Sequence, residues 1–263
     1  MNILKVIRPQ KKFRVWLIGD SCTDVYQYGT VDRISPEAPV PVFKHSYAET
    51  RPGMAENVKL NLESFGIEVN AMLGPNSVKT RIVDMRSRQH ILRIDSDTET
   101  KSVLFDPTED LTQYDAVVFS DYNKGWVSYE LVETIRQKFK GPVFIDTKKQ
   151  DLARFWDCYV KVNESEYQNR WSINNKLIVT LGSQGAIYNE LKRNENKFPA
   201  DPVEVVDVCG AGDTFLAALV AEYLNTNNIS DAIKFANRAS AISVQHNGVY
   251  ALTKEDIKKI RRK

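Results

Sequence analysis

Short apolar runs that alternate with helical stretches restrict the fold of this chain more than any other feature of its sequence. Runs of strand length occupy Phe13–Gly19, Val69–Leu73, Asp115–Ser120, Pro142–Asp146, Tyr159–Asn163 and Leu177–Leu181. Apolar residues recur at helical spacing over Ser128–Phe139 and then, through most of the C-terminal third, over Ala211–Asn225, Ser230–Gln245 and Thr253–Arg261. This alternation predicts an α/β protein whose doubly wound, mostly parallel sheet is flanked by helices.

Size and charge limit the classes of function. The 263 residues fit one α/β unit, so we expect a single domain over residues 1–263. The formal net charge of +2 gives no reason to expect a nucleic acid or a membrane as partner. The three cysteines, Cys22, Cys158 and Cys209, are widely spaced, and no signal peptide or long apolar span accompanies them. We therefore expect a reducing compartment, the cytoplasm.

Two regions of the N-terminal half do not fit a central strand. The proline-rich segment Ser35–Val42 predicts an edge strand or a projecting flap, because proline cannot donate to a sheet ladder. The charged segments Lys79–Met85 and His90–Asp95 predict a hairpin. Between the two regions, apolar residues at helical spacing from position 55 to 65, followed by Gly66, predict an amphipathic helix.

A glycine-rich turn that ends in a carboxylate lies at Asp207–Asp213, where the apolar C-terminal helices begin. The amides of Gly210, Ala211 and Gly212 can approach an anion closely, and a helix N-terminus adds unpaired N–H groups. Asp213 would then accept a proton from a hydroxyl group. The turn indicates phosphoryl transfer, with an aspartate that only caps the helix as the alternative.

The segment Asp207–Asp213 resembles the C-terminal signature of the ribokinase (PfkB-type) carbohydrate kinases, and Arg51–Val58 resembles the segment with which that family holds its sugar. The resemblance implies a ribokinase-like fold with a small projecting β lid, at approximately residues 25–50 and 78–97. It also implies that ATP is the phosphoryl donor, that Asp213 is the catalytic base, and that the amides of Gly210, Ala211 and Gly212 form the anion hole.

A narrower resemblance extends from about Arg14 to Thr253. Gly19–Asp24, Arg33–Val42, Ser120–Gly125 and Ile145–Lys148 are similar to segments of the D-glycero-heptose 7-phosphate kinases, which supply ADP-heptose for surface polysaccharides. The implied reaction is phosphorylation of the 1-hydroxyl of D-glycero-D-manno-heptose 7-phosphate to the 1,7-bisphosphate. Together the two resemblances imply a set of substrate-binding residues: Asp20, Asp24, Arg33, Gly53, Asn57, Lys79, Arg81, Asp121 and Lys124. For Lys79 and Arg81, which would meet the sugar phosphate, the alternative is a solvated surface.

Further residues resemble the family's nucleotide and metal sites. The resemblance assigns the nucleotide to Lys148, Asn163, Thr180, Gly182, Gly185, Asp207 and Asn237, and it assigns Mg²⁺ to Asn163 and Glu166. Carboxylate and amide oxygens suit this hard cation, which keeps several waters. The alternatives are a helix cap at Asn163, a hairpin turn at Thr180–Gly185 and a helix-surface Asn237. The resemblance also allows a monovalent cation such as K⁺ and a homodimer through the β lid.

Three departures from the family pattern leave the acceptor open. Only Gly74–Val78 connects Leu73 to Lys79, where the family has a further helix and strand, so we expect a shortened sheet. Met54 replaces a glycine of the sugar motif, and Cys209 replaces a threonine of the anion-hole turn. A kinase for another sugar or sugar phosphate, or a non-catalytic sugar- or nucleotide-binding relic, therefore remains an alternative, although the intact Asp213, Asn163 and Glu166 favour an enzyme.

Other chemistries have less support in the sequence. Neither a Gly-x-x-x-x-Gly-Lys-Ser/Thr loop nor a protein-kinase motif set occurs. No histidine is placed to activate a cysteine nucleophile. The three histidines, His45, His90 and His246, are isolated, so the His-x-Gly-His motif of a nucleotidyltransferase is missing and we expect this chain to carry the kinase step alone.

Overall fold

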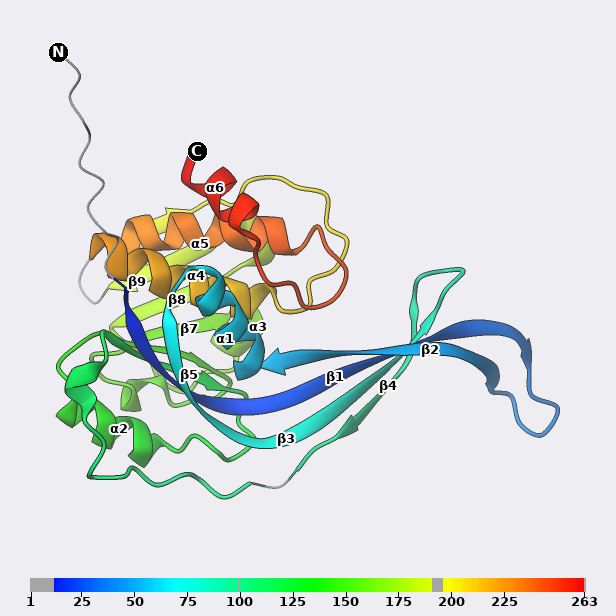
Figure 1. The fold of residues 1–263 in the computed structure, drawn as a ribbon, viewed down its shortest axis with the longest axis horizontal. Helices are drawn as coiled ribbons and strands as arrows, with labels where there is room; N and C mark the ends of the chain where they lie inside the picture. Colours follow the sequence, from blue (N-terminus) through cyan, green and yellow to red (C-terminus); the bar gives the residue numbers. More distant parts are fainter. Residues whose placement is uncertain (1–11, 99, 191–195, 263) are drawn as a thin grey trace, which may run out of the picture.

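A ten-stranded mixed sheet runs through the computed structural model, which describes residues 12–98, 100–190 and 196–262 (Figure 1). Its strands are β1 (Arg14–Ile34), β2 (Pro41–Met54), β3 (Glu68–Asp84), β4 (His90–Ser96), β5 (Ala116–Asp121), β6 (Val143–Thr147), β7 (Tyr159–Asn163), β8 (Lys176–Thr180), β9 (Ala186–Glu190) and β10 (Asn196–Phe198). The order is β10-β9-β8-β7-β6-β5-β1-β3-β4, and β2 pairs with β1. The neighbours from β3 through β1 and β5 to β8 are parallel, whereas the pairs at both ends are antiparallel.

Helices cover both faces of this sheet. They are α1 (Ala55–Ser64), α2 (Tyr129–Lys138), α3 (Glu164–Gln168), α4 (Ala211–Thr226), α5 (Ile229–Ser243) and α6 (Lys254–Arg262). Along β1, Val15 and Leu17 join the core formed with α1, α4 and α5, whereas Trp16 and Ile18 join the core formed with α2. Alternate residues of a strand point to opposite faces, so two separate cores result. The predicted doubly wound, mostly parallel α/β fold is confirmed.

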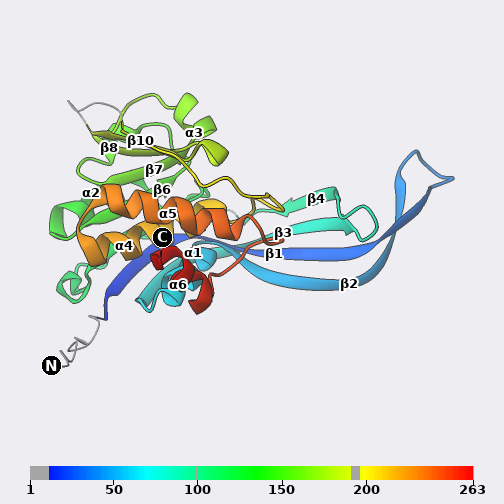
Figure 2. The same ribbon diagram turned by 90° about the horizontal axis from the view of Figure 1, so that it is seen from above.

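A four-stranded lid projects from one end of the sheet (Figure 2). The N-terminal halves of β1 and β3 lie in the core, and their C-terminal halves continue into the lid, where β2 pairs with β1 and β4 pairs with β3. The predicted hairpin is therefore confirmed as the end of β3 together with β4. The prolines of the Ser35–Val42 segment lie in the turn between β1 and β2 and at the start of β2, which is a projecting flap as expected.

The strand predicted to end at Leu73 and the hairpin segment predicted to begin at Lys79 are one continuous strand, β3, so the separate bounds were wrong. The pairing of β1 with β3 shifts between Gly19 and Ser21, which oppose Leu73 and Asn76, so Gly74 and Pro75 form a bulge. A bulge tolerates a proline that cannot donate to the ladder. A Cβ on Gly74 would lie 2.9 Å from the Trp126 side chain, so glycine lets the strand pass this ring. Residues 74–78 are thus part of β3 and join its half in the core to its half in the lid.

The remaining elements agree with the sequence, with two exceptions. The helices at 128–139, 211–225, 230–245 and 253–261 are present within two residues of their predicted bounds. Strands β9 and β10 were not predicted, and they add an antiparallel edge beside β8. Among the described residues, no helix is long and apolar enough to cross a membrane. The assignment of residues 1–263 to one domain stays a prediction.

Candidate active site

The N-terminus of α4 lies close to polar side chains of α1 and β7. Gly210, the residue before α4, has φ 75°, a left-handed conformation that glycine adopts without a Cβ clash. A Cβ at Gly210 would lie 2.7 Å from Asn57 Nδ2, and one at Gly212 would lie 2.9 Å from Lys161 Nζ. Both glycines therefore allow polar side chains to approach a helix terminus that has unpaired N–H groups and a positive dipole end. This is the geometry of an anion site.

Asp213 lies in the first turn of α4 and is 3% exposed. Its Oδ2 accepts a hydrogen bond from Asn57 Nδ2 at 3.0 Å, and its Oδ1 accepts one from the Tyr122 hydroxyl at 2.9 Å. Burial raises the pKa of Asp213 to about 6, against the lowering effect of these hydrogen bonds and of Lys161. A carboxylate with this pKa is ionised at neutral pH and is still basic enough to accept a proton from a reacting hydroxyl.

Tyr122 is a site residue that the sequence analysis missed. The Nζ atoms of Lys148 and Lys79 lie 4.7 and 5.5 Å from the centroid of its ring, while its hydroxyl donates to Asp213. Burial, followed by the charge of Asp213, holds the pKa of Tyr122 well above its usual range, so the hydroxyl remains a donor. The signal was its position directly after β5, at the sheet edge where ligands gather.

A buried ion pair lies beneath the anion-hole turn and was also missed. Lys161 Nζ donates to Asp146 Oδ2 at 2.6 Å, and this lysine is 4% exposed. The Nζ atom faces Gly212, so it brings a positive charge to the start of α4. The detectable signal was a lysine inside the buried strand Tyr159–Asn163, because a charged side chain in a central strand needs a specific partner.

The lid strands carry three of the predicted substrate residues close together. Asp24 on β1 forms a two-point ion pair with Arg81 on β3, whose Nη2 and Nε lie 2.9 and 3.2 Å from Asp24 Oδ1. Both side chains are largely buried, at 12% and 6% side-chain exposure for Arg81 and Asp24. A Cβ on Gly53 would lie 2.4 Å from Asp24 Oδ2, so glycine is required where β2 passes this carboxylate. The structure thus brings Asp24, Arg81 and Gly53 together, near Asn57.

Met54 adopts a backbone conformation that is unusual for its residue type. Its φ is 54° and its ψ is −132°, a combination found mainly in glycine, and its side chain is buried. Holding a side chain in such a conformation costs about 1–3 kcal/mol and requires support from its surroundings. The backbone therefore follows the path expected for the glycine of the sugar motif, while the methionine side chain adds volume at the start of α1.

The side chains of three other predicted substrate residues form hydrogen bonds or ion pairs within the protein. These residues are Asp20, Asp121 and Lys124. Asp20 accepts from the backbone N–H groups of Tyr122 and Lys124, at 2.7 and 3.3 Å. Asp121 is 1% exposed and accepts from Lys149 Nζ at 2.7 Å and from the Thr147 hydroxyl at 2.7 Å. The Lys124 side chain pairs with Asp97. Asp20 thus holds the backbone after β5, and Asp121 at the end of β5 is held by Thr147 and Lys149.

The residues predicted to bind the nucleotide, apart from Asp207, line two adjoining cavities. One, of about 380 Å³, has an apolar wall from Val203, Val205, Phe215 and Val244. The other, of about 690 Å³, is lined by polar side chains that include Lys148, Asn163 and Glu166. Both are bordered by Thr180, Gly182 and Gly212, so an apolar compartment and a polar compartment meet at the anion-hole turn.

Asn237 and Gly185, two of the residues predicted to bind the nucleotide, line the apolar compartment. Asn237 is 6% exposed, and its Nδ2 donates to the Phe198 carbonyl at 2.8 Å, so the alternative of a helix-surface residue is excluded. Gly185 has φ 90°, and a Cβ there would lie 2.0 Å from the Phe198 carbonyl oxygen. Both residues therefore contact the 198–200 segment that forms part of the wall.

Asn163 and Glu166 form a helix capping box. Glu166 N–H donates to Asn163 Oδ1 at 2.8 Å, and Asn163 N–H donates to Glu166 Oε2 at 2.7 Å, while Lys148 Nζ lies 3.0 Å from Glu166 Oε1. The described residues contain no group of three or more histidine, cysteine or acidic side chains that could enclose a metal. One carboxylate at a polar cavity still fits Mg²⁺, since that ion commonly keeps its waters and binds substrate phosphates. Glu166, with Asn163 beside it, fits such a site.

Two predicted residues, Arg33 and Asp207, line neither of these two cavities. Arg33 is exposed and sits one residue before the end of β1, at the tip of the lid. Asp207 accepts from the N–H groups of Cys209 and Gly248, at 2.9 and 2.8 Å, and lines a different cavity from the nucleotide residues. Asp207 thus joins the anion-hole turn to the 247–248 segment.

The cysteines do not offer a nucleophile. Burial raises the pKa of Cys209 to about 11 and that of Cys22 to about 12. A thiol is a weak nucleophile until it is deprotonated, so both side chains are unreactive at neutral pH. This agrees with the expectation from the sequence.

The chain is similar to known carbohydrate kinases. A family model described as pfkB family carbohydrate kinase matches residues 54–256. The bifunctional protein HldE of Nitratiruptor sp. is 31% identical over 309 residues, which covers 95% of this chain. This chain spans only 65% of that relative, and 62% of the HldE protein of Campylobacter curvus.

Solved structures show the same fold. The ribokinase of Thermotoga maritima superposes with a TM-score of 0.70 at 17% identity, covering 95% of this chain and 100% of the ribokinase. The Arabidopsis thaliana ribokinase, solved with ribose and ATP, gives a TM-score of 0.72 at 14% identity, covering 95% and 99%. The fold of this chain is ribokinase-like. Since the family model covers most of its length, the chain belongs to the pfkB family of carbohydrate kinases.

Proposed function

We propose that this protein is an ATP-dependent sugar kinase in which Asp213 is the catalytic base. The observation that carries the proposal is the position of Asp213, which is buried in the first turn of α4 beside Gly212, where both cavities meet, and is hydrogen-bonded to Asn57 and Tyr122. Its pKa of about 6 suits proton transfer near neutral pH.

The proposed reaction places one substrate on each side of this carboxylate. Asp213 accepts the proton of the attacking sugar hydroxyl, while Asn57 and Tyr122 orient its two oxygens. The N–H groups of residues 210–212 hold the charge on the transferred phosphoryl group, and Lys161 adds a positive charge behind them. When bound near Glu166, Mg²⁺ would neutralise phosphate charge.

For the acceptor we propose the 1-hydroxyl of D-glycero-D-manno-heptose 7-phosphate, which would give the 1,7-bisphosphate for ADP-heptose synthesis. The likeness to HldE over 95% of the chain supports this choice. Asp24 and Asn57 provide polar atoms for sugar hydroxyls. Met54 and the continuous β3 alter the acceptor side, and these two observations favour a kinase for another sugar or sugar phosphate as the second candidate.

The test is ADP release from ATP and Mg²⁺ with a panel of sugars and sugar phosphates that includes heptose 7-phosphate. We expect sugar-dependent ADP release that Asp213→Asn slows by about 10²–10⁴-fold. Turnover of a different sugar in the panel would support the second candidate. Nucleotide or sugar binding without turnover of any acceptor would contradict both and favour the non-catalytic relic.

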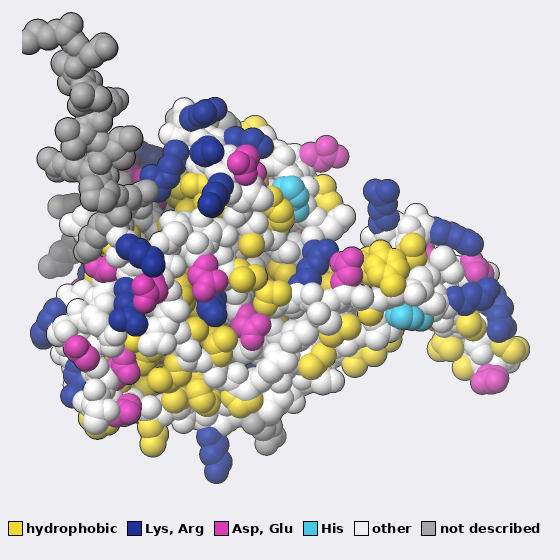
Figure 3. All heavy atoms as spheres, viewed as in Figure 1, with side chains coloured by type: hydrophobic (Ala, Val, Ile, Leu, Met, Phe, Trp, Pro, Cys, Tyr) yellow, Lys and Arg dark blue, Asp and Glu magenta, His cyan; other side chains and the backbone are white. Residues whose placement is uncertain are grey.

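We also propose a homodimer through the lid. Ile34, Val40, Leu92 and Ile94 are 47–60% exposed on lid strands and their connecting turn, and Figure 3 shows hydrophobic side chains along the projecting arm. Sedimentation analysis tests this, with a monomer at all concentrations as the contrary result.

The K⁺ requirement and the cytoplasmic location stay predictions.

A further inference from the structure

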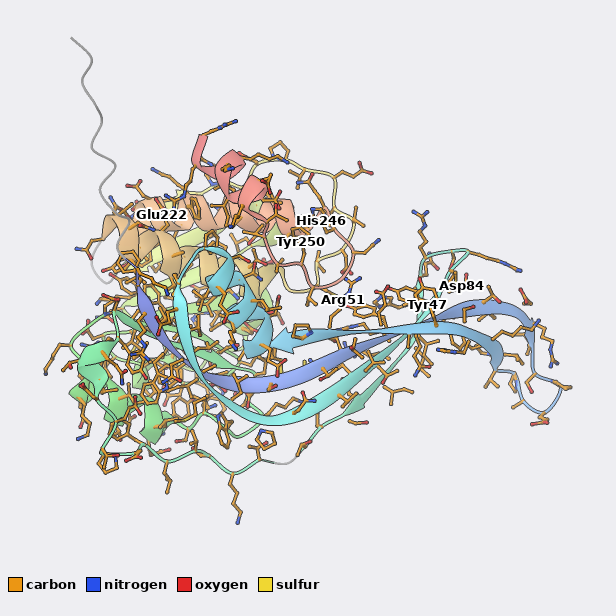
Figure 4. The ribbon with its side chains drawn as sticks, in the orientation of Figure 1. Tyr47, Arg51, Asp84, Glu222, His246 and Tyr250 are labelled. Carbon is orange, nitrogen blue, oxygen red and sulfur yellow. The ribbon has the colours of Figure 1, made fainter. Side chains whose placement is uncertain are left out.

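A third cavity, of about 460 Å³, lies between the base of the lid and the segments at 206–207 and 247–248. It is separate from the two nucleotide cavities and shares none of their lining residues. Figure 4 shows Tyr47, Arg51 and Asp84, which line it, along the lid near the C-terminal segment that carries His246.

Tyr26 connects this cavity with the acceptor side. It is two residues beyond Asp24 on β1, a step of about 6–7 Å along a strand. The guanidinium carbons of Arg81 and Arg51 lie 5.7 and 5.2 Å from the centroid of its ring, and Tyr26 also lines the cavity. An acceptor bound at Asp24 therefore reaches the cavity by extending along the lid.

The Tyr26 hydroxyl is buried and has no hydrogen-bond partner within residues 12–98, 100–190 and 196–262. A buried hydroxyl without a partner costs free energy, so its presence at a cavity wall points to a ligand atom. In the same described part of the chain, the guanidinium of Arg88 makes no ion pair or hydrogen bond, although it lines the cavity. The φ of Arg88 is 57°, a strained conformation for a bulky residue that often accompanies function.

The carboxylates of the cavity are already satisfied by the protein. Asp84 accepts from the N–H groups of Ser87 and Val31, at 2.8 and 3.3 Å, and Asp207 accepts from two others. Glu49 pairs with Arg51 at 3.2 Å. A ligand in this cavity would therefore meet hydrogen-bond donors. They are the Tyr26 hydroxyl, the Arg88 guanidinium and the His90 ring.

On the acceptor side, by contrast, Arg81 is held by Asp24 at two points. A phosphate at Arg81 would have to displace a buried carboxylate. From these contacts we infer that the cavity lined by Tyr26, Arg88 and His90 binds the phosphate at the non-reacting end of the acceptor sugar. This inference rests on the proposed sugar-kinase function and names where the remote phosphate lies.

The experiment compares D-glycero-D-manno-heptose 7-phosphate with the same heptose lacking the phosphate. Arg88→Asn removes the charge with a residue that tolerates positive φ. We expect it to raise KM for the phosphorylated sugar about tenfold or more, since charge-assisted hydrogen bonds are worth that much, and to leave KM for the free sugar nearly unchanged. Tyr26→Phe should act in the same direction, with a smaller effect.

Arg86→Asn is the matched control, because Arg86 lies in the same hairpin but pairs with Asp32 and does not line the cavity. It should leave both KM values unchanged. Equal effects of Arg88→Asn on the two sugars, or a similar effect of Arg86→Asn, would overturn the subsite while leaving the kinase function intact. Absence of turnover with both heptoses and with the whole sugar panel would instead overturn the proposed function, and the subsite with it.

Discussion

The proposed nucleotide side and the proposed acceptor side of the active site are built in different ways. On the nucleotide side, residues end short parallel strands or begin helices: Asn163 is the last residue of β7, and Gly212 lies in the first turn of α4. On the acceptor side, Asp24, Arg81 and Gly53 lie within long strands and meet only through cross-strand pairing.

This difference determines which structural changes would displace the residues of each side. A residue at a strand end is positioned by its own short segment and by the sheet edge that parallel strands share. A residue inside a lid strand is positioned by register, and a slip of one residue would turn it to the other face. The bulge at Gly74 and Pro75 sets the register that places Arg81 near Asp24. The acceptor side therefore depends on more distant parts of the chain.

Asp213 serves both sides, so its replacement should have the largest effect. Asp213→Asn keeps the shape of the side chain but removes the base, and we expect kcat to fall by about 10²–10⁴-fold. Nucleotide affinity, measured by titration calorimetry, should stay close to that of the wild type. A variant that retains more than about a tenth of the wild-type rate would show that Asp213 only caps α4.

A matched pair of glycine substitutions sharpens the comparison. In Gly53→Ala the new Cβ would meet Asp24 Oδ2 at 2.4 Å, so we expect a higher acceptor KM and a loss of up to about 10²-fold in kcat/KM from misplacement. In Gly212→Ala it would meet Lys161 Nζ, so the ATP parameters should change instead. Steady-state kinetics with each substrate varied in turn measures both. Identical profiles for the two variants would mean that the sides are not independent.

The pH dependence of kcat/KM tests whether the base is Asp213. Because protonated Asp213 cannot accept a proton, kcat/KM should fall as pH drops through about 6. The hydrogen bond from Tyr122 lowers the pKa of Asp213, so Tyr122→Phe should move this acid limb to higher pH, by less than about one unit for one hydrogen bond. A limb that stays in place, or moves to lower pH, would remove Tyr122 from the control of this carboxylate.

Glu166→Gln should have the smallest effect. Glutamine can still form the capping box with Asn163, so α3 should remain folded, while one negative charge near the phosphates disappears. We expect the Mg²⁺ concentration for half-maximal rate to rise several-fold, because a carboxylate is the preferred Mg²⁺ ligand. Glu130→Gln removes the same charge from an exposed residue that lines neither cavity, and it serves as the control. Equal Mg²⁺ dependence in wild type and Glu166→Gln would exclude Glu166 from the metal site.

The sequence by itself determined the layered fold and the start of α4. Periodic apolar residues identify the core strands and helices, and the Asp207–Asp213 turn predicts the start of α4 with Asp213 in its first turn. These features depend on neighbours in the chain, so local patterns are enough to predict them.

Only the tertiary structure decided which polar groups remain available for a ligand. It joined the predicted strands on either side of Gly74 into β3, engaged Arg81 with Asp24 and Asp121 with Lys149, and placed Tyr122 against Asp213. Among the residues that the structure describes, it also left the Tyr26 hydroxyl without a hydrogen-bond partner, beside the third cavity. Partners that lie 28 to 91 residues apart are brought together by register and burial, and the sequence pattern around each residue contains neither.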